Sequence, residues 1–209
     1  MLRKDIDIFL SSIPKDVKVV AATKYIGSDE MKQLYEHNIK DFGENRVDAF
    51  LVKYNDLKDY KDISWHFIGH LQRNKAKKII NKINYLHSLD SLELACLIDK
   101  ERETPLDTFI EVSINLEESK NGVPYYEVEK FIKEVRKYPK VHLVGLMMMA
   151  VKGSLNTEDQ FEKLKSLRDE LEKKINIQLP YLSMGMSDDY LSAIKAGATH
   201  IRLGRILYE

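Results

Sequence analysis

Short apolar runs alternate with charged, amphipathic segments along the whole chain. Such alternation is typical of βα units arranged around a parallel sheet. Eight runs have the length and composition of buried strands: VKVVAAT at 17–23, KDFGEN at 40–45, SWHFIG at 64–69, YLHSLD at 85–90, DTFIEVSI at 107–114, VHLVGLMMMA at 141–150, YLSMG at 181–185 and THIRLGRI at 199–206.

The segments between these runs have the spacing of amphipathic helices. In SDEMKQLYEHN, at 28–38, Met31 and Leu34 share one face and Ser28 is placed to cap the helix. The segment at 156–174 repeats the pattern with Phe161 and three leucines. Before the first strand, charged and apolar residues interleave at helical spacing, which predicts an additional N-terminal helix.

Eight βα units are the number that closes a (β/α)₈ barrel of the TIM type. A doubly wound open sheet is the competing architecture, because period alone does not separate the two. No GxGxxG or GxxxxGK[ST] motif follows an early strand, so the usual nucleotide signature of open sheets is missing. No linker divides the chain, and we therefore predict one barrel domain over residues 1–209.

Polar residues interrupt the apolar runs mainly where the predicted strands end. In a barrel these carboxyl ends converge on one mouth, where active sites lie. The residues expected there are Lys24, Glu44, Asn45, Gly69, His70, Ser113, Asn115, Ser183 and Arg202.

Charge and cysteine content limit the classes of partner. The 33 basic and 33 acidic residues cancel, so no global field attracts nucleic acid or a membrane surface, and a small-molecule partner is favoured. Cys96 is the only cysteine, which fits a reducing compartment and reads as a small core residue. No stretch resembles a signal peptide or an uncharged membrane span. The sequence predicts a cytoplasmic protein.

Lys24 ends a run of small and apolar residues and is followed by a break at Gly27. A lysine at the mouth of an apolar barrel is expected to lose hydration, which favours the neutral amine that attacks carbonyl carbons. A lysine that only extends into solvent from the strand end is the ordinary alternative.

The last two predicted strands add a candidate phosphate site. In TIM barrels the loops after strands seven and eight, with the N-terminus of a short helix, commonly hold phosphate. Here that region carries Ser183, Ser187, Gly204 and Arg205. An aldehyde-trapping lysine opposite a phosphate cradle is the pattern of a pyridoxal phosphate site.

Taken together, VVAATKY, DFGEN, WHFIGHLQRNK, ESKNG, VGLMMMA, LSMGMSDD and HIRLGR, in this order, resemble the pyridoxal phosphate homeostasis protein family. That family's fold resembles the barrel domain of alanine racemase. The resemblance implies that Lys24 holds pyridoxal 5'-phosphate as an internal aldimine, and that Asn45 lies beside the cofactor. It also implies that Ser183, Gly204 and the residue at Arg205 contact the phosphate.

By similarity to this fold type, Arg202 is expected to face the pyridine nitrogen. An arginine keeps that nitrogen unprotonated and makes the ring a poorer electron sink than an acidic partner would. Arg205 stands where the family usually has a threonine or serine, so whether its side chain reaches the phosphate is left open.

The resemblance implies a monomeric, non-catalytic protein that stores or delivers the cofactor, with transient contacts to pyridoxal phosphate-dependent apoenzymes. A racemase is the first alternative, but a two-base racemase also needs an acid/base group that comes with a further domain and a partner subunit. A Schiff-base aldolase would explain Lys24 and the phosphate site but would leave the GEN and HIRLGR motifs unexplained. A scaffolding role would make all of these residues incidental.

Other residues fit less specific roles. His66 and His70 have no evident third ligand, so structural roles and no metal are expected. Glu117, Glu118 and Lys120 are expected in a charged wall or lid of the site. The basic run RNKAKKIINK lacks the clustered aromatic residues of a nucleic-acid surface.

Overall fold

A computed structural model of the chain describes residues 1–114, 122–150 and 156–208. Eight parallel strands form a closed ring in the order β4-β3-β2-β1-β9-β8-β7-β5, and pairing of β4 with β5 closes it. The strands are β1 (Lys18–Ala22), β2 (Asp41–Glu44), β3 (Ser64–Phe67), β4 (Tyr85–Leu89), β5 (Leu106–Ser113), β7 (Val141–Met147), β8 (Tyr181–Met186) and β9 (His200–Leu203). The predicted TIM-type barrel is confirmed. All eight predicted strands are present, and the closed ring excludes the open sheet.

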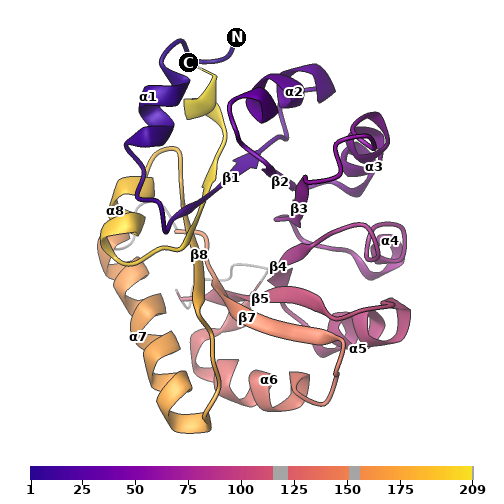
Figure 1. Cartoon of the computed structure of the whole chain (residues 1–209). Helices are drawn as coiled ribbons and strands as arrows, with labels where there is room; N and C mark the ends of the chain where they lie inside the picture. Colours follow the sequence, from indigo (N-terminus) through magenta and orange to yellow (C-terminus); the bar gives the residue numbers. More distant parts are fainter. Residues whose placement is uncertain (115–121, 151–155, 209) are drawn as a thin grey trace.

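Helices surround the ring on its outside (Figure 1). They are α2 (Ser28–Glu36), α3 (Val47–Asp56), α4 (Arg73–Ala76), α5 (Leu92–Glu101), α6 (Val128–Val135), α7 (Thr157–Ile175) and α8 (Tyr190–Lys195), with 3-10 turns η1 (Tyr125–Glu127) and η2 (Arg205–Leu207). A short strand, β6 (Val123–Pro124), pairs with β5 beside the ring. Ser28 does not cap α2: Gly27 occupies that position, and the Ser28 hydroxyl donates to Asp56 at 2.6 Å.

The predicted N-terminal helix is α1 (Ile6–Ser11), which buries Ile6 and Phe9. The chain before it lies against the C-terminal segment, where the Arg3 amide donates to the Leu207 carbonyl at 3.1 Å. The two ends of the chain therefore lie side by side (Figure 1).

The apolar core lies mainly between the ring and its helices, as the alternating pattern predicted. Inside the ring, Phe109, Val144 and Met147 form a small cluster against Tyr85. Cys96 is exposed, so its expected place in the core is wrong. The inward face of α5 carries Leu94, Ala95 and Ile98, and Cys96 follows on the other side of the helix.

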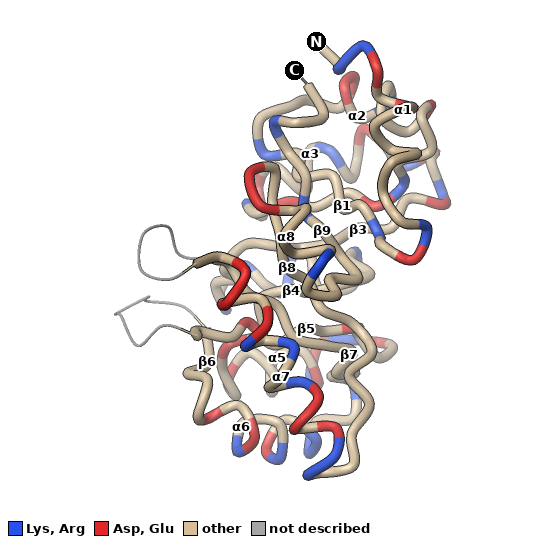
Figure 2. The backbone as a smooth tube through the Cα atoms, turned by 90° about the vertical axis from the view of Figure 1, so that its left-hand side faces the viewer, with Lys and Arg blue, Asp and Glu red and all other residues tan. Residues whose placement is uncertain are grey.

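Acidic and basic residues are interspersed over the described backbone (Figure 2), and the chain carries 33 of each sign. Within the described ranges, no helix has the combined length and apolarity that crossing a membrane requires.

Candidate functional site at the barrel mouth

The predicted site residues lie on four strands that are neighbours in the ring. Lys24 follows β1, Asn45 follows β2, and Ser183 lies on β8. Arg202 lies on β9, ahead of Gly204 and Arg205. Because the ring order is β2-β1-β9-β8, these residues gather in one sector of the barrel at or near the carboxyl ends of the strands.

Lys24 is exposed, so the desolvation expected for this lysine is not found. Its ammonium nitrogen lies 4.7 Å from the ring centroid of Tyr25, which is itself exposed. The turn after β1 carries both side chains beyond the buried strand, and run composition alone does not show where the strand stops.

The residue before Lys24 is fixed by a buried polar cluster. Thr23 donates through its hydroxyl to Glu44 Oε1 at 2.7 Å, and its carbonyl accepts from Lys53 Nζ at 2.6 Å. Glu44 and Lys53 form a buried ion pair. The second Glu44 oxygen accepts from the Asn45 amide at 3.1 Å. One carboxylate thus contacts both the side chain of the residue before Lys24 and the backbone of Asn45.

Asn45 is exposed and is held from its other side by the loop after β3. A Cβ atom at Gly69 would lie 2.5 Å from the Asn45 carbonyl oxygen, so only glycine allows this approach. The Gly69 carbonyl accepts from the Ser88 hydroxyl at 2.6 Å. Consecutive strand ends are thereby locked together around Asn45.

Arg202 lies buried inside the ring. Its guanidinium donates to the Ser183 hydroxyl at 2.6 Å and to the Met148 carbonyl at 2.8 Å. Burial lowers the pKa of Arg202 to about 10, so the guanidinium stays charged at neutral pH. Ser183 is fully buried and also contacts His87 Nδ1 at 2.8 Å. Its hydroxyl is therefore engaged within the barrel, and the predicted phosphate contact stays a prediction.

Acidic residues lie near the guanidinium. Burial raises the pKa of Glu111 on β5, the charge of Asp90 adds to the rise, and the charge of Arg202 opposes it. Asp90 Oδ2 lies 3.1 Å from His70 Nδ1. Glu111 is not among the residues predicted from the sequence, although a carboxylate within an apolar strand run was an available signal.

Backbone N–H groups after β9 converge on the hydroxyl of Ser187. Gly204 donates to Ser187 Oγ at 3.2 Å and Ile206 at 3.5 Å. Arg205 points elsewhere, because its guanidinium donates to both carboxylate oxygens of Asp188, at 3.0 and 3.1 Å. Convergent N–H donors are the kind of group that holds a phosphate. Ser187, rather than Ser183, lies beside them.

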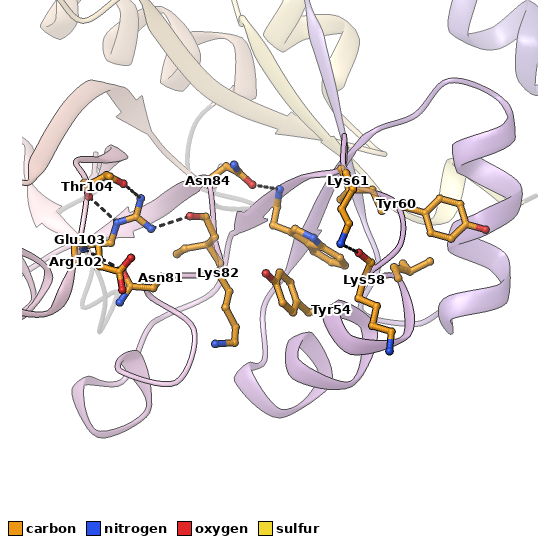
Figure 3. A pocket seen from close by; sticks show the side chains of 14 residues that line it. Tyr54, Lys58, Tyr60, Lys61, Asn81, Lys82, Asn84, Arg102, Glu103 and Thr104 are labelled. Carbon is orange, nitrogen blue, oxygen red and sulfur yellow. Dashed lines mark hydrogen bonds between the residues drawn. The ribbon is translucent and has the colours of Figure 1, made fainter.

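A separate hollow of about 410 Å³ lies at the opposite end of the barrel (Figure 3). Its wall includes Ile63, Asn84 and Thr104, which precede β3, β4 and β5. The guanidinium of Arg102 is engaged there with backbone carbonyls, including that of Ile80 at 2.6 Å. None of the predicted site residues lines this hollow, and the amino end of a barrel is the end associated with stability.

Some expectations fall outside the described ranges: those for Asn115, Glu117, Glu118 and Lys120. Among the residues that are described, no three His, Cys, Asp or Glu side chains are grouped to hold a metal. His66 lies inside the barrel against His87 and Asp41, and His70 lies at the mouth against Asp90.

Comparison with known proteins decides the family. The chain matches the model of the alanine racemase N-terminal domain over residues 2–209. The pyridoxal phosphate homeostasis protein of Aquifex aeolicus (strain VF5) is 39% identical over 196 residues, 91% of this chain and 86% of the relative. The chain belongs to the pyridoxal phosphate homeostasis protein family. The predicted resemblance is confirmed.

Solved structures share this barrel. PipY of Synechococcus elongatus PCC7942, solved with PLP bound, superposes with a TM-score of 0.91 at 28% identity, covering 98% of this chain and 100% of PipY. Alanine racemase of Clostridium difficile 630 superposes with a TM-score of 0.78 at 16% identity, covering 99% of this chain and 57% of the racemase. The racemase comparison shows the fold alone.

Proposed function

We propose that this chain binds pyridoxal 5'-phosphate at the barrel mouth and acts in the cytoplasm to hold and release the cofactor. One observation carries the proposal: a single sector of the mouth combines the amine of Lys24, the buried guanidinium of Arg202 and the convergent N–H groups of Gly204 and Ile206. PipY, a relative with the same fold, has been solved with PLP bound.

The residues at the mouth fit three parts of this cofactor: its aldehyde, its phosphate and its pyridine ring. When bound, the cofactor supplies an aldehyde and an electron-accepting ring. Lys24 would attack the aldehyde carbon through its neutral amine, forming a C=N bond and releasing water. Gly204, Ile206 and the Ser187 hydroxyl would hold the phosphate, with Ser183 and the Arg205 backbone as further predicted contacts. Asn45 would lie beside the ring.

Arg202 would face the pyridine nitrogen as a donor. Because its guanidinium stays charged, it leaves that nitrogen unprotonated and disfavours carbanion chemistry on the ring. The site is thereby better suited to storing the cofactor than to transforming a substrate. We infer a non-catalytic, monomeric carrier that meets pyridoxal phosphate-dependent apoenzymes only transiently.

A racemase-like activity is the second candidate, and Glu111 is the observation that favours it. Burial raises the pKa of this carboxyl group, which lies near Arg202, and a buried carboxyl group with a raised pKa is a candidate acid/base group. Incubation of the loaded protein with alanine in D₂O separates the candidates. Exchange of the α-hydrogen that is lost in Glu111→Gln would favour the racemase.

The first test is the visible spectrum of the purified protein with added pyridoxal phosphate, followed by borohydride reduction and peptide mapping. An imine band and a reduced adduct on Lys24 are expected. Lys24→Ala should lose both while unfolding at the same temperature as the wild type. Lys163→Ala, at an exposed lysine of α7, is the matched control and should keep both. A covalent adduct in Lys24→Ala would overturn the assignment.

A further inference from the structure

A continuous chain of hydrogen bonds crosses the inside of the barrel. It starts at Arg202, which donates to Ser183 Oγ at 2.6 Å. Ser183 Oγ lies 2.8 Å from His87 Nδ1, and His87 Nε2 lies 2.9 Å from His66 Nδ1. His66 Nε2 then lies 2.9 Å from Asp41 Oδ1. Asp41 is the first residue of β2, so the chain links the mouth to the opposite end of the barrel.

The two ends of this chain fix the direction of every bond in it. Arg202 can only donate and the ionised carboxylate of Asp41 can only accept. Starting from Asp41, each neutral histidine donates through Nε2 and accepts at Nδ1, so His87 Nδ1 takes the hydrogen of Ser183, whose oxygen accepts from Arg202. His87 carries its proton on Nε2 and donates to His66 Nδ1, and His66 donates through Nε2 to Asp41. Each ring has one tautomer that satisfies all of its neighbours.

The surroundings favour this single arrangement. His66, His87 and Ser183 are fully buried, and burial lowers the pKa of both histidines, which keeps them neutral. Burial tends to raise the pKa of Asp41, but the hydrogen bond from His66 and the pairing with Lys18 outweigh it and bring the pKa to about 2. Tyr85 stacks on His66 at 4.5 Å between ring centroids, which restricts rotation of that ring.

We propose that His87 is a positioning residue for Arg202: by taking the Ser183 hydrogen, it turns the hydroxyl oxygen toward the guanidinium and so fixes the donor that meets the cofactor ring. Asp41 and His66 hold His87 in the tautomer that this requires. This inference rests on the proposed function only where it concerns the pyridine ring of the cofactor. The order of the hydrogen bonds and its effect on Arg202 belong to the protein without cofactor.

The alternative is that the chain only satisfies buried polar groups. In that case the replacements below would change stability but would leave unchanged both the proton exchange of the Arg202 guanidinium and the absorbance of the bound cofactor. His87→Asn keeps an acceptor near the Nδ1 position, whereas His87→Phe removes it and preserves stacking on Phe109, whose ring centroid lies 4.3 Å away. His37→Asn, at a partly exposed histidine bonded to Asp7, is the matched control.

The first experiment uses cofactor-free protein labelled with ¹⁵N. The wild type should show His87 and His66 each as one neutral Nε2–H tautomer, together with slowly exchanging Nη protons of Arg202. His87→Phe should exchange those Nη protons about tenfold faster, and His87→Asn should stay within about threefold of the wild type. Unchanged exchange in His87→Phe, or a wild-type His87 protonated on Nδ1, would overturn the proposal.

Asp41→Asn tests the far end of the chain and serves if His87→Phe does not fold. An amide can donate as well as accept, so both tautomers of His66 become possible. We expect a mixture of tautomers at His87 as well, although His87 does not itself hydrogen-bond to Asp41. A single unchanged tautomer at His87 would show that Asp41 does not fix it and would overturn that part of the proposal.

The second experiment adds pyridoxal phosphate. His87→Phe should weaken binding about tenfold, shift the absorbance maximum of the bound cofactor and change its pH profile, while His37→Asn should do none of these. A wild type that fails to bind would overturn the proposed function and leave the NMR result standing. If the wild type binds and His87→Phe has the same affinity and spectrum, His87 does not position Arg202 toward the pyridine ring, and that part of the proposal is overturned.

Discussion

The hydroxyl of Thr23 donates to Glu44 Oε1 at 2.7 Å, and each of these residues immediately precedes a predicted cofactor-binding residue. Thr23 comes before Lys24, and Glu44 comes before Asn45. Two neighbouring strand ends are thereby tied together in the core, while the residues that would meet the cofactor remain exposed. The rigid part of the site lies behind its reactive part.

Glu44→Gln should lower the free energy of unfolding by about 3–5 kcal/mol, because it leaves the Lys53 ammonium buried without its carboxylate. Denaturant titration measures the change. Asp48→Asn breaks an exposed pair with Lys75 and should cost far less, because water and salt screen exposed charges. Equal losses in the two variants would contradict the importance assigned to the buried pair.

Gly69→Ala should displace the Asn45 backbone, because the new methyl group would lie 2.5 Å from the Asn45 carbonyl oxygen. We expect a loss of about 1–3 kcal/mol in stability and weaker binding of pyridoxal phosphate, measured by thermal unfolding and by spectral titration. Gly27→Ala is the control, since its nearest contact is the flexible Glu30 carboxylate at 3.2 Å. Unaltered binding in Gly69→Ala would argue against a role for this approach in the site.

His200 should make the protein less stable as the pH falls. Burial is the main cause that lowers its folded pKa to about 3 from an ordinary value of 6.5. The unfolded chain binds the proton more tightly, so stability falls from about pH 6.5 downward and continues to fall until the pH approaches 3. By pH 4.5, His200 alone should cost about 2–3 kcal/mol.

His200→Phe removes this titration and keeps an aromatic ring against Tyr181, which lies 5.0 Å away between centroids. Unfolding free energies measured from pH 7 to pH 4.5 should decline less steeply in the variant than in the wild type. Parallel curves for the two proteins would show that His200 does not remain neutral in the folded state.

Arg205→Thr should leave the affinity for pyridoxal phosphate within about threefold of the wild type, because the Arg205 side chain pairs with Asp188 and the predicted contact is its backbone N–H. Ser187→Ala, beside the convergent N–H groups, should weaken binding about tenfold. Spectral titration compares both. A larger loss in Arg205→Thr than in Ser187→Ala would mean that the guanidinium leaves Asp188 to hold the phosphate.

All eight strands could be predicted because strands of a closed parallel barrel are buried on both faces, which leaves continuous apolar runs in the sequence. The position of Lys24 near a strand end followed from the same runs. Its exposure did not, because it depends on how the turn after β1 leaves the ring. The exposure of Cys96 depends likewise on the rotation of α5.

The polar interior could not be predicted, because its contacts join residues far apart in the chain. Ser183 and His87 are separated by 96 positions, and nothing near either residue specifies the other. Short apolar strands with isolated polar residues also leave open which face those residues occupy. For Ser183, the sequence did not predict the hydrogen bond from Arg202 inside the barrel, while the expected phosphate contact stays a prediction.

The pairing of β1 with β9 determines when the site can form during folding. The two strands align Lys18 with His200 and Val20 with Arg202, so the first and last strands of the ring must meet before it closes. Such a contact spans nearly the whole chain, and parallel pairings of this range form slowly. During synthesis β1 can pair with β2 early, but its other edge has no partner until β9 has left the ribosome. Arg202 therefore joins the mouth in a late step, and cofactor binding should report the completed ring rather than an intermediate.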